Sequence, residues 1–184
     1  FNEKKIIQKI QKKLKFPVVI KPINEGSSVS VYICKKNNFF SNLKKLRHYD
    51  EILIEKFIPG REIQVAILGN EKLGVIELKP KRKFYDYEAK YNPKAKTEHI
   101  IPVNISKKNY DKVTSIALKA HKLLKCRGVT RSDFRFDGKK FYLLETNTQP
   151  GMTALSLVPE IARYRNISFA KLIDKILLDA SINK

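Results

Sequence analysis

Two carboxylates and one amide in the second half of the chain could bind a divalent metal. Asp133, Glu145 and Asn147 offer hard oxygen ligands of the kind that Mg²⁺ uses alongside substrate phosphates. Because side chains alternate along a strand, Arg131, Asp133 and Arg135 share one face of their strand, and Glu145 and Asn147 share one side of the next strand. The pattern Glu-x-Asn-x-x-Pro-Gly, which runs into a loop, favours a functional site. The alternative is a structural Arg–Glu pair on a sheet.

A hairpin would bring these residues together. Two runs of strand-like residues flank Asp137-Gly138, a dipeptide that favours a hairpin turn. A three-residue loop at 137–139 would pair Arg131 with Glu145 and place Asp133 diagonal to Glu145. The two carboxylates would then lie within side-chain reach of each other.

A second group of residues could bind a phosphate. Lys21 ends a short apolar run, and the loop that follows contains Gly26, Ser27 and Ser28. Small residues let backbone N–H groups approach an anion, and a lysine adds a point charge. The order of a Walker loop is absent, and an ordinary turn is the alternative interpretation.

Two glutamates could contact a nucleoside. Glu55 and Glu62 flank the turn Pro59-Gly60. Carboxylates near a purine can accept hydrogen bonds from its exocyclic amine or from ribose hydroxyls. Two solvated glutamates on strands are the alternative.

The elements that must position these groups follow from apolar spacing and from turn residues. They predict an α+β chain with mostly antiparallel pairs, and residues 79–97 form a long polar stretch without a sustained period. Helices are expected near 6–14, 39–47 and 106–124, from 156, and over 168–179. Strands are expected at 18–21, 29–33, 52–57, 62–68, 72–78, 129–136 and 140–145.

The composition is that of a globular chain with a strong positive charge. Hydrophobic residues make up 42% and charged residues 30%, which argues against disorder. The net charge of +20 invites a nucleic-acid hypothesis, but the basic residues are dispersed and no recognition motif accompanies them. A basic module without catalysis stays an alternative, although we expect neither nucleic-acid nor membrane binding. Cys34 and Cys126 show no metal or disulfide spacing and suit a reducing compartment.

Taken in order, the motifs resemble the D-alanine–D-alanine ligases of the ATP-grasp superfamily. The resemblance covers practically the whole chain, and its last two motifs are the most specific. It is carried by residues 16–22, 25–29, 54–58, 60–62, 84–91, 126–128, 131–134 and 144–153.

The resemblance implies an ATP-grasp fold, ATP and two Mg²⁺ or Mn²⁺ ions, and joining of two D-alanines through an acyl phosphate for peptidoglycan precursors. It puts the metals on Asp133, Glu145 and Asn147. Lys21 and Lys90 would contact nucleotide phosphates, whereas Glu55, Phe57, Ile58 and Glu62 would contact adenine and ribose. The oxyanion site would be Arg131 with the N–H of Gly151, the second substrate would meet Ser156 and Leu157, and Tyr91 would bond to Ser27 in a lid.

The resemblance also implies a division of the chain and a missing part. Residues 1–58 would be part of the central subdomain, and 59–184 the C-terminal subdomain with the nucleotide, metal and substrate site. The family's N-terminal domain would be absent, so we expect the chain alone to be poorly active. The alternatives are another carboxylate–amine ATP-grasp ligase, a D-alanine–D-lactate ligase, which Tyr91 disfavours, and a non-catalytic fragment. The location would be cytoplasmic, and the resemblance leaves open a homodimer of the full-length form.

Overall fold

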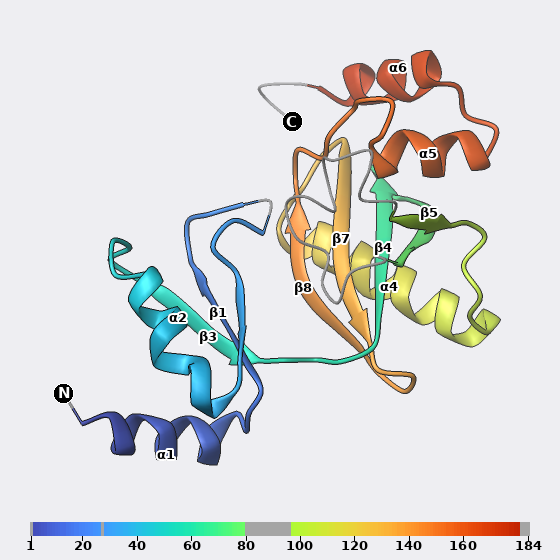
Figure 1. The fold of residues 1–184 in the computed structure, drawn as a ribbon. Coiled ribbons are helices and arrows are strands. Elements are labelled where there is room, and N and C mark those ends of the chain that lie inside the picture. Colours follow the sequence, from blue (N-terminus) through green and yellow to red (C-terminus); the bar gives the residue numbers. More distant parts are fainter. Residues whose placement is uncertain (1, 27, 80–96, 181–184) are drawn as a thin grey trace. The chain divides into compact units, whose positions relative to one another are not determined.

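The computed structural model describes residues 2–26, 28–79 and 97–180, and these divide into two units. The first comprises the described residues up to Ile58 together with Thr97. The second comprises Pro59–Lys79 and the residues from Glu98 onward. Figure 1 shows both units as ribbons coloured along the chain.

The first unit is a small antiparallel sheet with helices on one face. Its order is β2-β1-β3, and alternation along β1 turns Val18 and Ile20 toward the helices and Lys21 toward the other face. The core contains Ile10 of the first helix and Phe39 of the second. The elements are α1 (Glu3–Lys13), β1 (Val18–Pro22), β2 (Tyr32–Cys34), η1 (Lys36–Asn38), α2 (Phe39–Lys45) and β3 (Ile52–Lys56).

The second unit is built on a five-stranded antiparallel sheet of order β6-β5-β4-β7-β8. Every strand pair described in either sheet is antiparallel, so the predicted α+β class with antiparallel sheets is confirmed. The strands are β4 (Arg61–Leu68), β5 (Glu71–Lys79), β6 (Glu98–Ile100), β7 (Val129–Phe136) and β8 (Phe141–Asn147).

Helix α4 (Lys107–Leu123) covers one face of this sheet (Figure 1). Ser106 caps it by accepting a hydrogen bond from the N–H of Asn109. The apolar side chains on that face bury against the helix and form the core of the unit. The core residues are Ile63, Val65, Ile67, Val75, Val103, Val113, Ala117, Phe134 and Phe136.

The opposite face of the sheet is shared by a helix and by polar side chains. Helices α5 (Leu157–Tyr164) and α6 (Phe169–Asp179) end the described chain, and α5 packs on β5. This packing requires Gly74, because a Cβ there would lie 2.6 Å from Cγ2 of Ile161. The rest of that face, on β4, β7 and β8, carries the charged residues described below.

Two strands differ from the prediction. The strand expected at 29–33 is only Tyr32–Cys34, because Ser28 and Ser30 adopt positive φ angles of 61° and 56° and the N–H of Val29 donates to Gly26. Strand β6, which pairs with the end of β5, was not predicted. None of the helices in the described ranges combines the length and apolar character of a membrane span.

Candidate active site

The candidate metal ligands lie in two adjacent rows on the sheet face opposite α4. Gln64, Asp133 and Glu145 are direct neighbours across β4, β7 and β8. In the next row, Arg131 on β7 lies opposite Asn147 on β8. Directly opposite residues in antiparallel strands share a face and lie about 5 Å apart at Cβ. The structure therefore gathers two carboxylates, two amides and one guanidinium on one patch.

A β-bulge sets this pairing, and the predicted pairing of Arg131 with Glu145 is wrong. Near the turn Phe136 pairs with Phe141, so the connection is one residue longer than the loop expected at 137–139. The register then shifts between Asp133 and Phe134, and Leu144 is the extra residue. Without this bulge, Leu144 would lie opposite Asp133 and Glu145 would turn to the α4 side.

Asp133 is held from two sides. Arg131 donates to it through Nε at 2.8 Å and Nη2 at 3.0 Å, an arrangement in which both carboxylate oxygens are engaged. The Gln64 amide, turned so that its nitrogen faces β7, also donates to both oxygens, at 3.2 Å to Oδ2. Only 10% of the Asp133 side chain is exposed, so this carboxylate has a fixed orientation on the sheet.

Glu145 and Asn147 complete the oxygen set at the edge of the sheet. The Asn147 amide donates to Glu145 Oε1 at 3.4 Å, and Glu145 itself is exposed. Two facing carboxylates and an amide suit a hard divalent cation such as Mg²⁺ or Mn²⁺. Over the described residues, no group of three or more His, Cys, Asp or Glu could hold a metal. The fit therefore depends on Asn147 as the third ligand.

Glu62 lies one row from the metal candidates, at the other end of the same face. It is the direct partner of Arg135 on β7, and Arg135 Nη1 lies 2.5 Å from Glu62 Oε1. Their side chains are only 12% and 15% exposed. Gly60 lets the chain enter β4 at this point, since a Cβ there would overlap the carbonyl oxygen of Phe136.

The candidate substrate residues meet at the start of α5. Ser156 is the N-cap residue of the helix, but its hydroxyl accepts from the N–H of Thr153 at 2.9 Å instead of capping the helix. Gly151 lies close by, because a Cβ on it would be 2.9 Å from Ser156 Oγ. Leu157 is buried as the first helical residue. Gly151, Ser156 and Leu157 thus lie together at the start of α5.

The remaining nucleotide candidates belong to the first unit. Lys21 Nζ lies 2.9 Å from Glu55 Oε1, and the two side chains are 25% and 33% exposed. Both lie on the face of the small sheet that the helices leave uncovered. Phe57 and Ile58 follow β3, and the N–H of Phe57 donates to the carbonyl of Pro17. The predicted residues Ser27, Lys90 and Tyr91 lie outside the described residues.

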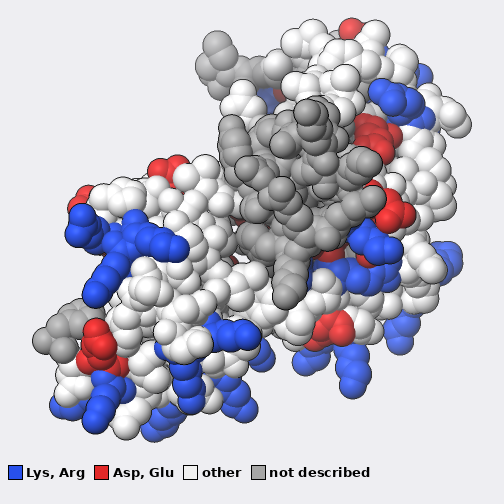
Figure 2. All heavy atoms as spheres, viewed as in Figure 1, with Lys and Arg blue, Asp and Glu red and all other residues white. Residues whose placement is uncertain are grey.

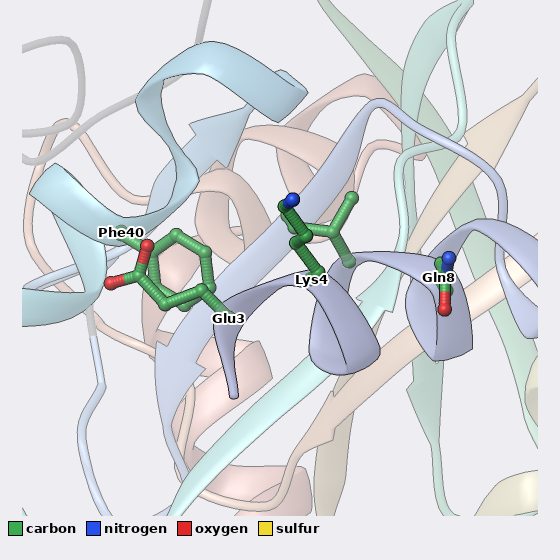
Figure 3. Close-up of a pocket in the computed structure, with 5 residues that line it drawn as sticks. Glu3, Lys4, Gln8 and Phe40 are labelled. Carbon is green, nitrogen blue, oxygen red and sulfur yellow. The ribbon is translucent and has the colours of Figure 1, made fainter. Parts of the chain in front are cut away.

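One further hollow, lined by described residues, lies away from this site. A hollow of about 320 Å³ lies between α1 and α2 (Figure 3) and is lined by Glu3, Lys4, Ile7, Gln8 and Phe40. It contains no residue of the predicted site. Figure 2 shows Lys and Arg side chains dispersed over the visible surface of each unit, with acidic residues between them.

The comparisons with known proteins agree with the geometry. Residues 1–178 match the protein family described as "D-ala D-ala ligase C-terminus". The chain belongs to this family. A D-alanine–D-alanine ligase of Pelagibacter ubique is 68% identical over 188 residues, a match that covers 100% of the chain and 62% of the relative. For the ligase of Paramagnetospirillum magneticum the identity is 46%, over 85% of the chain and 53% of the relative. The chain thus spans about three-fifths or less of these relatives.

Solved structures of the family share the fold. A D-alanine–D-alanine ligase of Bacillus anthracis superimposes with a TM-score of 0.80 at 34% identity, over 94% of the chain and 57% of that structure. The same enzyme described as complexed with ATP gives a TM-score of 0.77 at 31% identity, over 94% and 56%. The ATP-grasp fold expected from the motifs of this ligase family is therefore confirmed.

The sequence analysis missed Gln64, and it placed Arg135 on the face of Arg131 and Asp133 without a role or a partner. Gln64 interrupts the apolar run of β4 at a buried position, with an exposed fraction of 4%. Arg135 continues the alternation of Arg131 and Asp133 along β7. A polar residue inside a buried strand was the available signal for Gln64, but its partner becomes visible only with the register between β4 and β7.

Proposed function

We propose that the chain is the nucleotide, metal and second-substrate part of an ATP-dependent ligase that joins two D-alanines for peptidoglycan synthesis. The observation that carries this proposal is the row in which Asp133 faces Glu145, with Arg131 and Asn147 beside it, in a chain of the D-Ala–D-Ala ligase family. In this proposal residues 1–58 belong to the central subdomain, and 59–184 form the C-terminal subdomain.

The proposed reaction has two steps. A carboxylate oxygen of the first D-alanine attacks the γ-phosphorus of ATP, and ADP leaves. The amine of the second D-alanine then attacks the acyl carbon, loses a proton and forms the amide, and inorganic phosphate leaves. Because the reaction consumes ATP, we assign it to the cytoplasm.

The residues of the sheet have distinct roles in this proposal. Asp133, Glu145 and Asn147 would hold Mg²⁺ or Mn²⁺, which would neutralise charge on the transferring phosphoryl group. Arg131, together with the N–H of Gly151, would hold the oxygen that becomes negative when the amine adds. The bidentate contact with Asp133 already orients the Arg131 guanidinium on this patch.

Substrate binding uses the two other groups of residues. The carboxylate of the second D-alanine would meet Ser156 and the backbone at Leu157, where the N-terminus of α5 favours an anion. Lys21 would exchange Glu55 for nucleotide phosphate, and Glu55, Phe57 and Ile58 would border adenine. Glu62 would accept hydrogen bonds from the ribose. Ser27, Lys90 and Tyr91 keep their expected roles in the lid and at the phosphates.

The test is to measure phosphate release from ATP and to identify the dipeptide. Two proteins are compared: the chain, and the chain joined to the part of the Pelagibacter ubique ligase that the match does not cover. We expect D-alanine-dependent phosphate release and D-alanyl-D-alanine from the joined protein, with far less from the chain. Equal rates would contradict the expectation that positioning of the first D-alanine comes from outside the chain.

Two further measurements separate the alternatives. Product with D-lactate in place of the second D-alanine would favour a depsipeptide ligase. No phosphate release with any amino acid, despite metal-dependent ATP binding, would favour a non-catalytic fragment. Size-exclusion chromatography of the joined protein tests the homodimer.

A further inference from the structure

Arg135 has no role among those assigned so far, although its ion-pair partner Glu62 is placed at the ribose. Arg135 lies on β7, between β4 and β8, and its register partners are Glu62 on β4 and Tyr142 on β8. Its Nη1 is 2.5 Å from Glu62 Oε1, and both side chains are about nine-tenths buried. The Tyr142 hydroxyl in turn donates to Asp137 at 3.0 Å. The guanidinium is thus part of an ordered polar row next to the row of Asp133.

We propose that Arg135 is a positioning residue for nucleotide binding. It holds the Glu62 carboxylate in the orientation in which Glu62 accepts hydrogen bonds from the ribose hydroxyls. This inference rests on the proposed function, which puts Glu62 at the ribose. Arg135 acts through Glu62 and need not contact the nucleotide.

Burial makes such a partner necessary. A carboxylate that is only 12% exposed loses most of its hydration, so it stays ionised at low cost only beside a cation. An ionised carboxylate has about four acceptor positions. A carboxylate can therefore accept from more than one donor, so an ion pair does not by itself prevent hydrogen bonds from hydroxyl groups. Hydrogen bonds to an ionised acceptor are about twice as strong as neutral ones.

Orientation is the second contribution of Arg135. A glutamate side chain has several rotatable bonds, and ordering it on binding reduces affinity. The direct register of Glu62 and Arg135 fixes the carboxylate before nucleotide arrives. Removing the guanidinium should therefore weaken the ribose contacts and leave the phosphate and adenine contacts unchanged.

Strand β4 carries a second ion pair that serves as a matched control, on the α4 side of the sheet. Arg61 pairs with Glu77 across β4 and β5, with Nη2–Oε2 at 2.6 Å and side chains 33% and 10% exposed. Arg61 also donates to the carbonyl oxygen of Asn104. This pair lies on the α4 side of the sheet, so Arg61→Met removes a similar ion pair without touching the nucleotide face.

The experiment measures dissociation constants of Mg²⁺ complexes of ADP, 2′-deoxy-ADP and 3′-deoxy-ADP by calorimetry. The proteins are the wild-type chain, Glu62→Gln, Arg135→Met, Arg135→Lys and Arg61→Met, each with a thermal unfolding curve. For the wild type we expect ADP to bind at least ~10-fold more tightly than the weaker deoxy analogue, the size of one hydrogen bond to a charged group. In Glu62→Gln and in Arg135→Met, the ratio of the dissociation constants of deoxy-ADP and ADP should fall to about one. Both variants should bind deoxy-ADP as the wild type does. Arg135→Lys should restore part of the ratio, and Arg61→Met should keep it.

The outcomes separate the inference from its basis. If Glu62→Gln loses the ratio and Arg135→Met keeps it, Arg135 is a structural partner and the inference is wrong. If Glu62→Gln keeps the ratio, Glu62 does not contact the ribose, and that part of the proposed function fails together with the inference. If Arg61→Met also loses the ratio, then any disruption of β4 weakens ribose recognition, and the inference about Arg135 is wrong.

Discussion

Gly74→Ala tests the contact that holds α5 on the sheet. In the wild type nothing but hydrogen occupies the place of a Cβ at Gly74, and an added methyl would lie 2.6 Å from Ile161 Cγ2. Ordinary contacts begin at 3.4 Å, so the helix or the strand would have to move by about 0.8 Å. Ile161 has an exposed fraction of 0%, which means that its side chain cannot turn into solvent.

Two effects of opposite sign decide how much Gly74→Ala changes the free energy of unfolding. Overpacking a well-packed core costs about 1–3 kcal/mol. Replacing glycine by alanine within a strand returns roughly 0.5–1 kcal/mol, because the unfolded chain loses conformational freedom. With an overpacking cost in the middle of that range, about 2 kcal/mol, overpacking should prevail by about 1–1.5 kcal/mol. For a chain of this size that corresponds to a decrease in Tm of roughly 2–6 °C.

The assay is thermal and urea unfolding of the wild type and four variants. Gly26→Ala is the control, because no atom of the described part of the chain lies within 4 Å of an added Cβ there, and we expect its Tm to be unchanged or slightly higher. Ile161→Leu removes the Cγ2 methyl at nearly constant volume, so the double variant should recover most of the stability lost in Gly74→Ala. Because α5 begins at Leu157, we also expect that Gly74→Ala in the joined protein raises KM for D-alanine more than KM for ATP. A Tm for Gly74→Ala equal to that of the wild type, or no recovery in the double variant, would refute this account of the packing.

Three shorter predictions concern the metal, pH and nucleic acid. Glu145→Gln should reduce Mn²⁺ affinity, measured by electron paramagnetic resonance, by about 10-fold or more and leave Tm unchanged, since Glu145 is exposed; unaltered affinity would exclude it as a ligand. Burial lowers the pKa of His121 in the folded chain, although Asp179 partly opposes this shift. Its contribution to the free energy of unfolding should be complete above about pH 6.5 and be lost as the pH falls toward the folded-state pKa. His121→Asn should remove that slope in urea unfolding, and an unchanged slope would count against His121. Duplex DNA should bind weakly and with steep salt dependence, because the basic residues are dispersed; a tight complex at physiological salt would revive the basic-module alternative.

The hairpin shows what alternation along a strand can and cannot predict. That Asp133, Glu145 and Asn147 share a face followed from their spacing and is what the structure has. Which residue lies opposite which did not follow, because a longer turn and a bulge at Leu144 are both compatible with the same pattern. These two features shift the pairing in the same direction, so the diagonal pair expected for Asp133 and Glu145 became a direct one.

Contacts between residues far apart in the sequence were harder still to predict. Val29-Ser30-Val31-Tyr32-Ile33 alternates like a strand, but the backbone at Ser28 and Ser30 turns through positive φ angles that alternation does not reveal. Arg135 and Glu62 are 73 residues apart, and their pairing depends on the register between β4 and β7. The residue types indicated which chemistry to expect at the candidate site. Its ion pairs could be identified only from the register of the strands.

The bulge at Leu144 also affects the tendency of the molecule to associate with other chains in solution. Among the described residues β8 is one of the two edge strands of the larger sheet, and Leu143 and Leu144 are 42% and 45% exposed on it. An open edge with exposed leucines would invite another chain to add a strand. A bulge interrupts the regular spacing of outward N–H and C=O groups, so a straight strand cannot dock along it. Deleting Leu144 would keep Asp133 opposite Glu145 in an unbroken ladder, and the expected loss is in solubility, visible as light scattering, with the metal site intact.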